Sequence, residues 1–198
     1  VLSGIRNQKA IYTYPDIIIE LANKKWKSSP EKPRKIDDRL PFSFPEHKDR
    51  EDSWGVKKFP FDFFPPGLYK TFVYALLTYH PTKGLKFVVD FTNYMTQSYA
   101  DSEYAKKDDL ISINITLNSG DVKTVYANDF LWQVYRGTVV THYLLESILV
   151  AFEKYMLDMA KTNDKDTSTL LQSWMDYCLK NSNSIAISSV LVSVFLAY

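Results

Sequence analysis

The amino-acid sequence predicts a mainly α-helical protein, an α-solenoid-like stack of helix pairs with one inserted β-hairpin. Apolar residues recur at spacings of three and four over most of the chain, which is the period of an amphipathic helix. One segment, residues 110–127, alternates with a period of two instead. Hydrophobic residues make up 45% of the 198 residues and aromatic residues 15%, so the chain has enough apolar surface for a packed core.

The first predicted helix covers residues 15–27. Pro15 fits its first turn, because the N–H that proline lacks would be unpaired there anyway. Residues 28–66 form a long Pro-rich connection, which holds seven of the nine prolines and shows no helical period. Its charged part, up to Arg50, is expected to stay solvated. Its second part carries Trp54 and several Phe rings, which we expect to lie against the body since burying each ring is worth about 2 kcal/mol or more.

Two helices are predicted next, over about residues 67–79 and 85–99, and the breaker HPTKG between them makes an antiparallel pair. The hairpin follows. LISINITL alternates apolar and polar residues, NSGD contains the turn, and Gly120 supplies the positive φ that a tight turn requires. After it, we expect a short helix that is capped by Asn128 or Asp129 and stopped at Gly137.

Three more helices are predicted in the last third of the chain. The clearest covers residues 138–161, and its broad apolar face indicates a central position. Helices over about 166–179 and 184–198 follow after short turns. Helices stacked in chain order describe a solenoid of degenerate repeats better than a closed bundle. Because the chain begins with Val and ends inside an apolar run, we interpret residues 1–198 as a single helical-repeat fragment of a larger protein.

A few side chains near the start of the main helix are candidates for chemistry. His142 and Glu146 lie one helical turn apart, near enough for a hydrogen bond, and an ion pair is favoured over a catalytic or metal site. Arg136, shortly after Trp132, could bind a carboxylate or phosphate, but capping the carbonyls that end the short helix is the favoured interpretation. We predict no catalytic, metal or cofactor-binding residues and keep Arg136, Trp132, His142 and Glu146 as candidate interaction or structural residues.

Charge, cysteine content and targeting signals bound the function further. Lys and Arg number 24 against 23 Asp and Glu, and a net charge of +1 gives no signal for nucleic acid. The single cysteine, Cys178, excludes an internal disulfide, is expected in the core and fits a cytoplasmic protein. The uncharged segment 184–198 is shorter than the roughly 20 residues that span a bilayer, so a membrane-associated segment is only an alternative.

Several stretches together resemble one family. They are YPDIIIELA, PPGLYKTFVYALLTYHPTKGLKFVVDFTNYMTQSYA, LWQVYRGT, LLESILVAFEKYMLD and NSNSIAISSVLVSVFLAY. Over most of residues 12–198 the chain resembles the helical interior of very large bacterial ATP-binding proteins of the STAND or AAA-like kind. The resemblance implies a parent protein that binds ATP and acts as a sensor in anti-phage defence. No Walker A or Walker B motif is present here, so no ATP hydrolysis is carried onto these residues.

The sequence therefore predicts a non-catalytic scaffold and protein-interaction segment. Its expected partners are the rest of the parent polypeptide and either a protein partner or further copies of itself. A small stand-alone enzyme with a site around His142, Glu146 and Arg136 is kept as an alternative.

Overall fold

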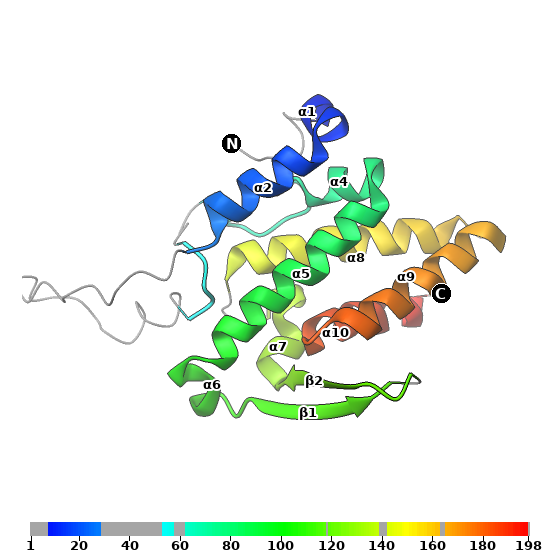
Figure 1. The fold of residues 1–198 in the computed structure, drawn as a ribbon. Coiled ribbons are helices and arrows are strands. Elements are labelled where there is room, and N and C mark those ends of the chain that lie inside the picture. The colour runs from blue at the N-terminus through cyan, green and yellow to red at the C-terminus, as the bar shows by residue number, and fades with distance from the viewer. Residues whose placement is uncertain are drawn as a thin grey trace, which may run out of the picture.

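The structure of the chain is a computed structural model. It describes residues 8–28, 53–57, 62–117, 119–138, 142–162 and 165–197. These residues form a mainly helical body with one antiparallel β-hairpin along its edge (Figure 1). The elements are, in chain order, α1 (Gln8–Thr13), α2 (Pro15–Trp26), α4 (Val73–Tyr79), α5 (Pro81–Ala100), α6 (Glu103–Lys107), β1 (Ile111–Thr116), β2 (Val122–Ala127), α7 (Asp129–Gln133), the 3₁₀ helix η1 (Val134–Arg136), α8 (Tyr143–Lys161), α9 (Lys165–Asn181) and α10 (Ile185–Ala197).

The predicted mainly helical fold with one hairpin is confirmed. Helix α2 and both strands begin and end close to the predicted residues, whereas the short helices α1 and α6 were not predicted. The solenoid-like stacking of helix pairs stays a prediction. Most of the predicted Pro-rich connection, including its charged part up to Arg50, lies outside the described residues.

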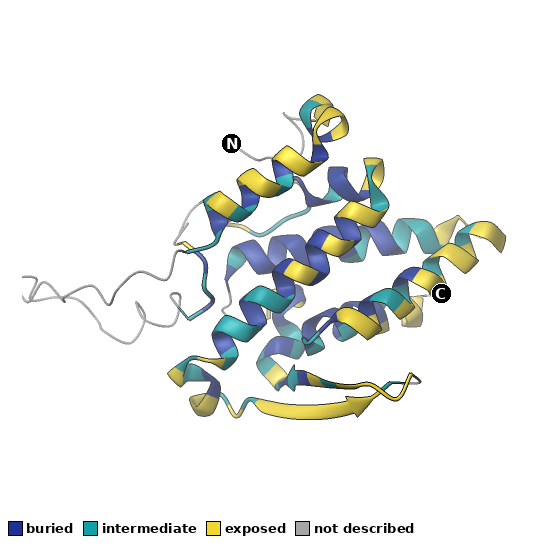
Figure 2. Ribbon diagram, in the orientation of Figure 1, coloured by how far each residue is buried: buried dark blue, intermediate teal, exposed yellow. Residues whose placement is uncertain are grey.

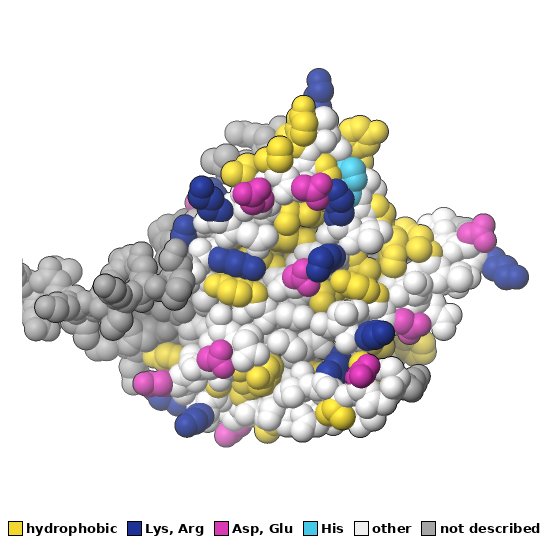
Figure 3. All heavy atoms as spheres, in the orientation of Figure 1, with side chains coloured by type: hydrophobic (Ala, Val, Ile, Leu, Met, Phe, Trp, Pro, Cys, Tyr) yellow, Lys and Arg dark blue, Asp and Glu magenta, His cyan; other side chains and the backbone are white. Residues whose placement is uncertain are grey.

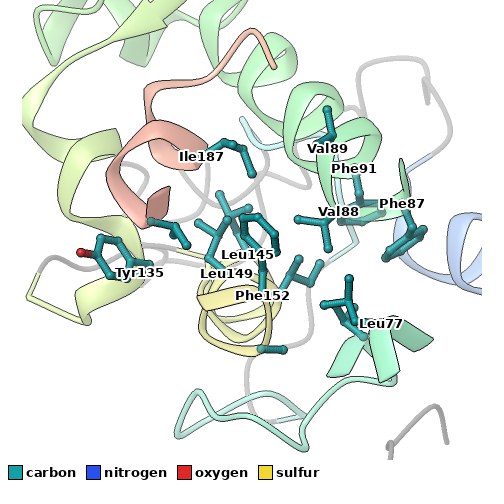
Figure 4. Close-up of a cluster of buried hydrophobic side chains, with 14 of the residues drawn as sticks. Leu77, Phe87, Val88, Val89, Phe91, Tyr135, Leu145, Leu149, Phe152 and Ile187 are labelled. Carbon is teal, nitrogen blue, oxygen red and sulfur yellow. The ribbon is translucent and has the colours of Figure 1, made fainter. Parts of the chain in front are cut away.

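Helix α8 is the centre of the body, as its broad apolar face predicted. It contacts α4, α5, α9, α10 and η1. Leu145, Leu149 and Phe152 are fully buried, and Figure 4 shows them between Val88 of α5 and Ile187 of α10. The helix begins at Tyr143 rather than at residue 138, because the backbone of His142 is extended (φ −80°, ψ 111°). Gly137 ends the preceding helix in a left-handed conformation (φ 64°).

The α4–α5 pair differs from the prediction at both starts. Helix α4 begins only at Val73, because the chain before it forms a turn in which the Lys70 N–H donates to the Gly67 carbonyl at 3.1 Å. The Gly67 N–H donates to Ser147 Oγ of α8 at 3.3 Å. Helix α5 begins at Pro81, so the predicted breaker shortens to one residue. Gly84 lies inside α5, where a Cβ would come within 2.9 Å of Leu77 Cα. Glycine is therefore needed there for the close packing of the two helices.

A cluster of aromatic rings packs helix α2 against the α4–α5 pair. The fully buried Trp26 ring lies 5.4 Å from Phe72 and 5.7 Å from Phe91, between ring centroids. Trp54, from the second part of the predicted connection, stacks on Tyr99 at 4.6 Å. The expectation that aromatic residues of this part lie against the body is thus confirmed for Trp54 and Phe63, which are 2% and 6% exposed, and is wrong for Phe64, which is 54% exposed.

Candidate functional site

A network of polar groups fixes the base of the hairpin. At the end of α5, the Tyr99 hydroxyl donates to the Asp108 carboxylate at 2.6 Å, and Asn128 Nδ2 donates to the Asp108 carbonyl at 3.0 Å. Asn128 also caps α7 as predicted, because its Oδ1 accepts the Leu131 N–H at 2.8 Å. Both ends of the hairpin are therefore held on the helical body.

Strand β2 is anchored along the edge that faces away from β1. The Tyr126 N–H donates to the Asn183 carbonyl at 2.8 Å, in the turn between α9 and α10. The Asn183 N–H in turn donates to Asn93 Oδ1 of α5 at 2.9 Å. Lys123 Nζ donates to the Ser182 carbonyl at 2.8 Å, and burial of this ammonium lowers its pKa. The helical body thus holds one edge of β2 and β1 holds the other.

Strand β1 is the free edge of the hairpin. All six of its residues are exposed, and Figure 2 shows the strand in the colour of exposed residues along its length. Ile111, Ile113 and Ile115 are 55%, 43% and 41% exposed. Val125 and Ala127, which face them from β2, are buried. In the described part of the chain β1 pairs with β2 alone, so its apolar side chains and outer backbone edge remain open to another strand.

A groove of about 610 Å³ lies at the base of the hairpin. Trp132 and Ile185 line it with partly buried apolar surface, and Asp109 and Asp129 line it with exposed carboxylates. Apolar surface beside carboxylates suits a ligand that is partly apolar and partly cationic. Its lining residues are Asp108, Asp109, Ile111, Ala127, Asn128, Asp129, Phe130, Trp132 and Ile185. Of the four candidates from the sequence, the groove thus includes Trp132 alone.

His142 and Glu146 are buried at the start of α8, at 8% and 7% exposure. The Glu146 N–H donates to the His142 carbonyl at 3.2 Å, but no hydrogen bond joins their side chains. His142 Nδ1 is buried without a hydrogen-bond partner in the described structure, and burial lowers the pKa of this imidazole to about 4. Burial also raises the pKa of the Glu146 carboxyl. The predicted ion pair between the two side chains is not observed, because His142 Nδ1 has no partner, and burial penalises the charged form of both groups.

Arg136 lies on the surface. Its Nε donates to the Tyr135 hydroxyl at 2.9 Å, its guanidinium lies 5.4 Å from the centroid of that ring, and the hydrogen bond raises its pKa. The predicted capping of the short helix by Arg136 is not observed among the described residues, because Gly137 ends that helix. The structure instead brings Gly137 to Glu146, since a Cβ on the glycine would lie 2.7 Å from Glu146 Oε1.

Two further kinds of site are absent from the part of the chain that the structure describes. Within the described residues, no group of three or more His, Cys, Asp or Glu could hold a metal ion. None of the described helices combines the length and hydrophobicity that a membrane crossing requires. Figure 3 shows basic and acidic side chains interspersed over the displayed face. The hairpin edge and the groove beside it are the features on which a functional proposal can rest.

Comparison with protein-family models finds none that matches the chain, and comparison with curated proteins finds no match either. The resemblance to the helical interior of large ATP-binding proteins therefore stays a prediction. The function of the chain has to be inferred from its own geometry.

The free edge of β1 is the candidate feature that sequence reasoning missed. The alternation of Ile111, Ile113 and Ile115 predicted the strand, but not its exposure. One signal was present, because a single hairpin in a helical chain must leave strand edges to be covered by something else. Which edge is covered depends on the Tyr126–Asn183 contact, which joins residues far apart in the sequence.

Proposed function

We propose that this chain is a non-catalytic scaffold and protein-interaction segment that binds a protein partner through the free edge of β1. The exposure of β1 carries the proposal, because this uncharged strand leaves three Ile side chains 41–55% exposed. Such an edge accepts an extended segment through main-chain hydrogen bonds, and apolar side chains at alternate positions add affinity and specificity.

The anchoring of the hairpin supports this role. The Asn128 contacts hold its base, and the Tyr126–Asn183 hydrogen bond holds β2 against the turn before α10. A partner strand would therefore meet an edge that is already ordered, so less conformational entropy is lost on binding. The helical body serves as the support that presents the edge.

We also propose that the helical body packs against other parts of a larger polypeptide, in the solenoid-like manner that the sequence predicts. Exposed apolar side chains on the outer helices support this step. Tyr12 and Ile17 near the start are 63% and 54% exposed, and Phe195 and Leu196 near the end are 74% and 77% exposed. In stacked helical repeats such faces are buried by the next helices.

The nature of the larger protein rests on the family resemblance alone. It supports an ATP-binding parent that acts as a sensor in anti-phage defence, and the lone Cys178 supports a cytoplasmic location. In this proposal the parent supplies the ATP chemistry and the present chain supplies a binding surface.

Site-specific photocrosslinking tests the binding edge. A photoreactive residue is placed at Ser112 on β1 and, as the matched control, at the equally polar and exposed Gln172 on α9. In cells that produce the parent protein, we expect Ser112 to form a protein adduct and Gln172 to form none. Mass spectrometry of the adduct should map the crosslink to an extended segment of the partner.

A pair of variants at one position separates edge pairing from other contacts. Asn114→Pro removes an outward N–H, and edge strands tolerate proline where the N–H faces solvent. Asn114→Val keeps that N–H. We expect Asn114→Pro to abolish the Ser112 adduct and Asn114→Val to retain it. Equal adducts from Ser112 and Gln172, or an Asn114→Pro adduct of unchanged yield, would refute the proposed function.

A further inference from the structure

The hairpin ladder determines which backbone groups of β1 face outward. The Leu117 N–H donates to the Asp121 carbonyl at 2.8 Å, so this pair is hydrogen-bonded. Hydrogen-bonded and non-hydrogen-bonded pairs alternate along an antiparallel ladder. In the observed register, Ile111, Ile113 and Ile115 therefore direct their N–H and C=O groups toward β2. We call Ser112, Asn114 and Thr116 the outward set, because their backbone groups face away from β2.

Strand β2 independently shows the same alternation of inward-facing and outward-facing backbone groups. Tyr126 is the register partner of Ser112, and its N–H faces away from β1 to donate to the Asn183 carbonyl. The side chains of β1 alternate between the two faces of the sheet with the same period of two. Ile111, Ile113 and Ile115 lie on the face that carries the buried Val125, while the polar residues of the outward set lie on the opposite face.

The residues of this strand form a near-palindrome about Asn114. Reading outward from Asn114 in the two directions gives Ile113 and Ile115, then Ser112 and Thr116, then Ile111 and Leu117. Each pair matches in chemical class, and no residue from 111 to 117 is charged. A two-fold symmetric interface requires this self-complementarity, whereas a strand that pairs with an unrelated partner does not.

We infer that the occupant of the free edge is a second copy of this chain, with β1 paired antiparallel to β1 of the other copy across a two-fold axis at Asn114. This inference rests on the proposed function and names its partner. Asn114 faces Asn114 of the second copy, and Ser112 faces its Thr116. These pairs fall on the outward set, so each exchanges two hydrogen bonds. Two hairpins then form one four-stranded sheet.

The same register explains why the exposed isoleucines stay on one face. Ile113 lies opposite Ile115 of the second copy, and Ile111 lies opposite its Leu117, so an apolar row crosses the two-fold axis without interruption. Cross-strand pairs of β-branched residues stabilise a sheet, and they bury surface that the single chain leaves 41–55% exposed. The opposite face brings hydroxyl and amide side chains together, so neither face places like charges opposite each other.

Charge variants at the symmetry axis test this arrangement in the full 198-residue chain. Analytical ultracentrifugation over a concentration series should show a monomer–dimer equilibrium. Asn114→Lys and Asn114→Asp each place like charges directly opposite across the axis and should raise the dimer dissociation constant roughly fivefold or more. A mixture of the two variants should restore the dimer as a heterodimer. Gln172→Lys, at an exposed position on α9 away from the hairpin, is the matched control and should dimerise as the wild type does.

Three results of these experiments would each overturn the inference. A wild-type chain that remains monomeric excludes the second copy as the occupant. A dimer that Asn114→Lys leaves unchanged places the interface elsewhere, and a mixture that fails to restore the dimer excludes the register centred on Asn114. If the chain is monomeric while Ser112 crosslinks to another protein in cells, the proposed function stands and this inference alone fails. Circular dichroism of each variant confirms that it is folded before its association is compared.

Discussion

Replacing His142 with leucine should reduce the loss of stability that the chain suffers when the pH falls from 6.5 to about 4. The imidazole is 8% exposed, and its Nδ1 is buried without a hydrogen-bond partner in the described structure. Burial lowers its pKa from 6.5 in a solvated histidine to about 4. The protein therefore keeps His142 neutral at pH values where an unfolded chain would protonate it.

The sign and size of this change in the free energy of unfolding follow from the number of protons that the folded and the unfolded chain bind. Above pH 6.5 His142 is neutral in both states and has no effect on the pH dependence. As the pH falls from 6.5 to about 4, the unfolded chain binds a proton that the folded chain does not, so the free energy of unfolding decreases. The full pKa difference corresponds to a loss of about 3 kcal/mol.

Glu146, which lies on the same helix, has the opposite effect on how the free energy of unfolding depends on pH. Burial raises the pKa of its carboxyl, so the folded chain takes up this proton before the unfolded chain does, and acidification favours folding. Glu146→Gln should consequently steepen the loss of stability on acidification, whereas His142→Leu should flatten it. The opposite effects of two neighbouring variants distinguish titration from a general packing defect.

Urea unfolding at a series of pH values from about 7.5 down to about 4.5 measures these effects as free energies of unfolding. His142→Leu should match or exceed the wild type at the upper end, since it also removes an unpaired buried polar atom. A His142→Leu variant with the wild-type slope would show that this reasoning is wrong.

Three further predictions concern packing in the body. Gly84→Ala should destabilise the chain by about 1–3 kcal/mol despite its gain in helix propensity, because the added Cβ would lie 2.9 Å from the Leu77 backbone. Thermal unfolding measures this effect. Gly67→Ala, whose Cβ would make only ordinary van der Waals contact, is the control. Asn93→Leu removes hydrogen bonds to the α9–α10 turn and should cost about 1–3 kcal/mol in urea unfolding. Burial raises the pKa of the Cys178 thiol to about 12, so a thiol reagent should label it only after unfolding, and rapid labelling of the native chain would contradict this.

The helical part of the fold was largely readable from local patterns. The apolar period of α8, the proline at the start of α2 and the caps at Asn128 and Gly137 each act within a few residues of themselves. Such signals predicted the type and order of the elements. They failed where the contact between two helices decides, as at Gly84, which was predicted in a breaker but lies inside α5 against Leu77 of α4.

The candidate site shows the same division. Trp132 was selected from the sequence, and the structure places it in the groove beside the hairpin. His142 and Glu146 were selected because of their helical spacing, which correctly places them on successive turns but cannot tell whether water reaches them. In the structure the two side chains form no ion pair, and burial penalises the charged form of each.

By itself, the sequence determined a mainly helical chain with one hairpin, and it determined the alternation and near-palindrome of β1, because periodicity and turn residues act over short distances. Only the tertiary structure decided that β1 is the free strand. Covering β2 requires the turn at Asn183 and the side chain of Asn93 on α5 to meet it in space. Pairing between residues so far apart depends on how the helices pack as a whole, which no local pattern specifies.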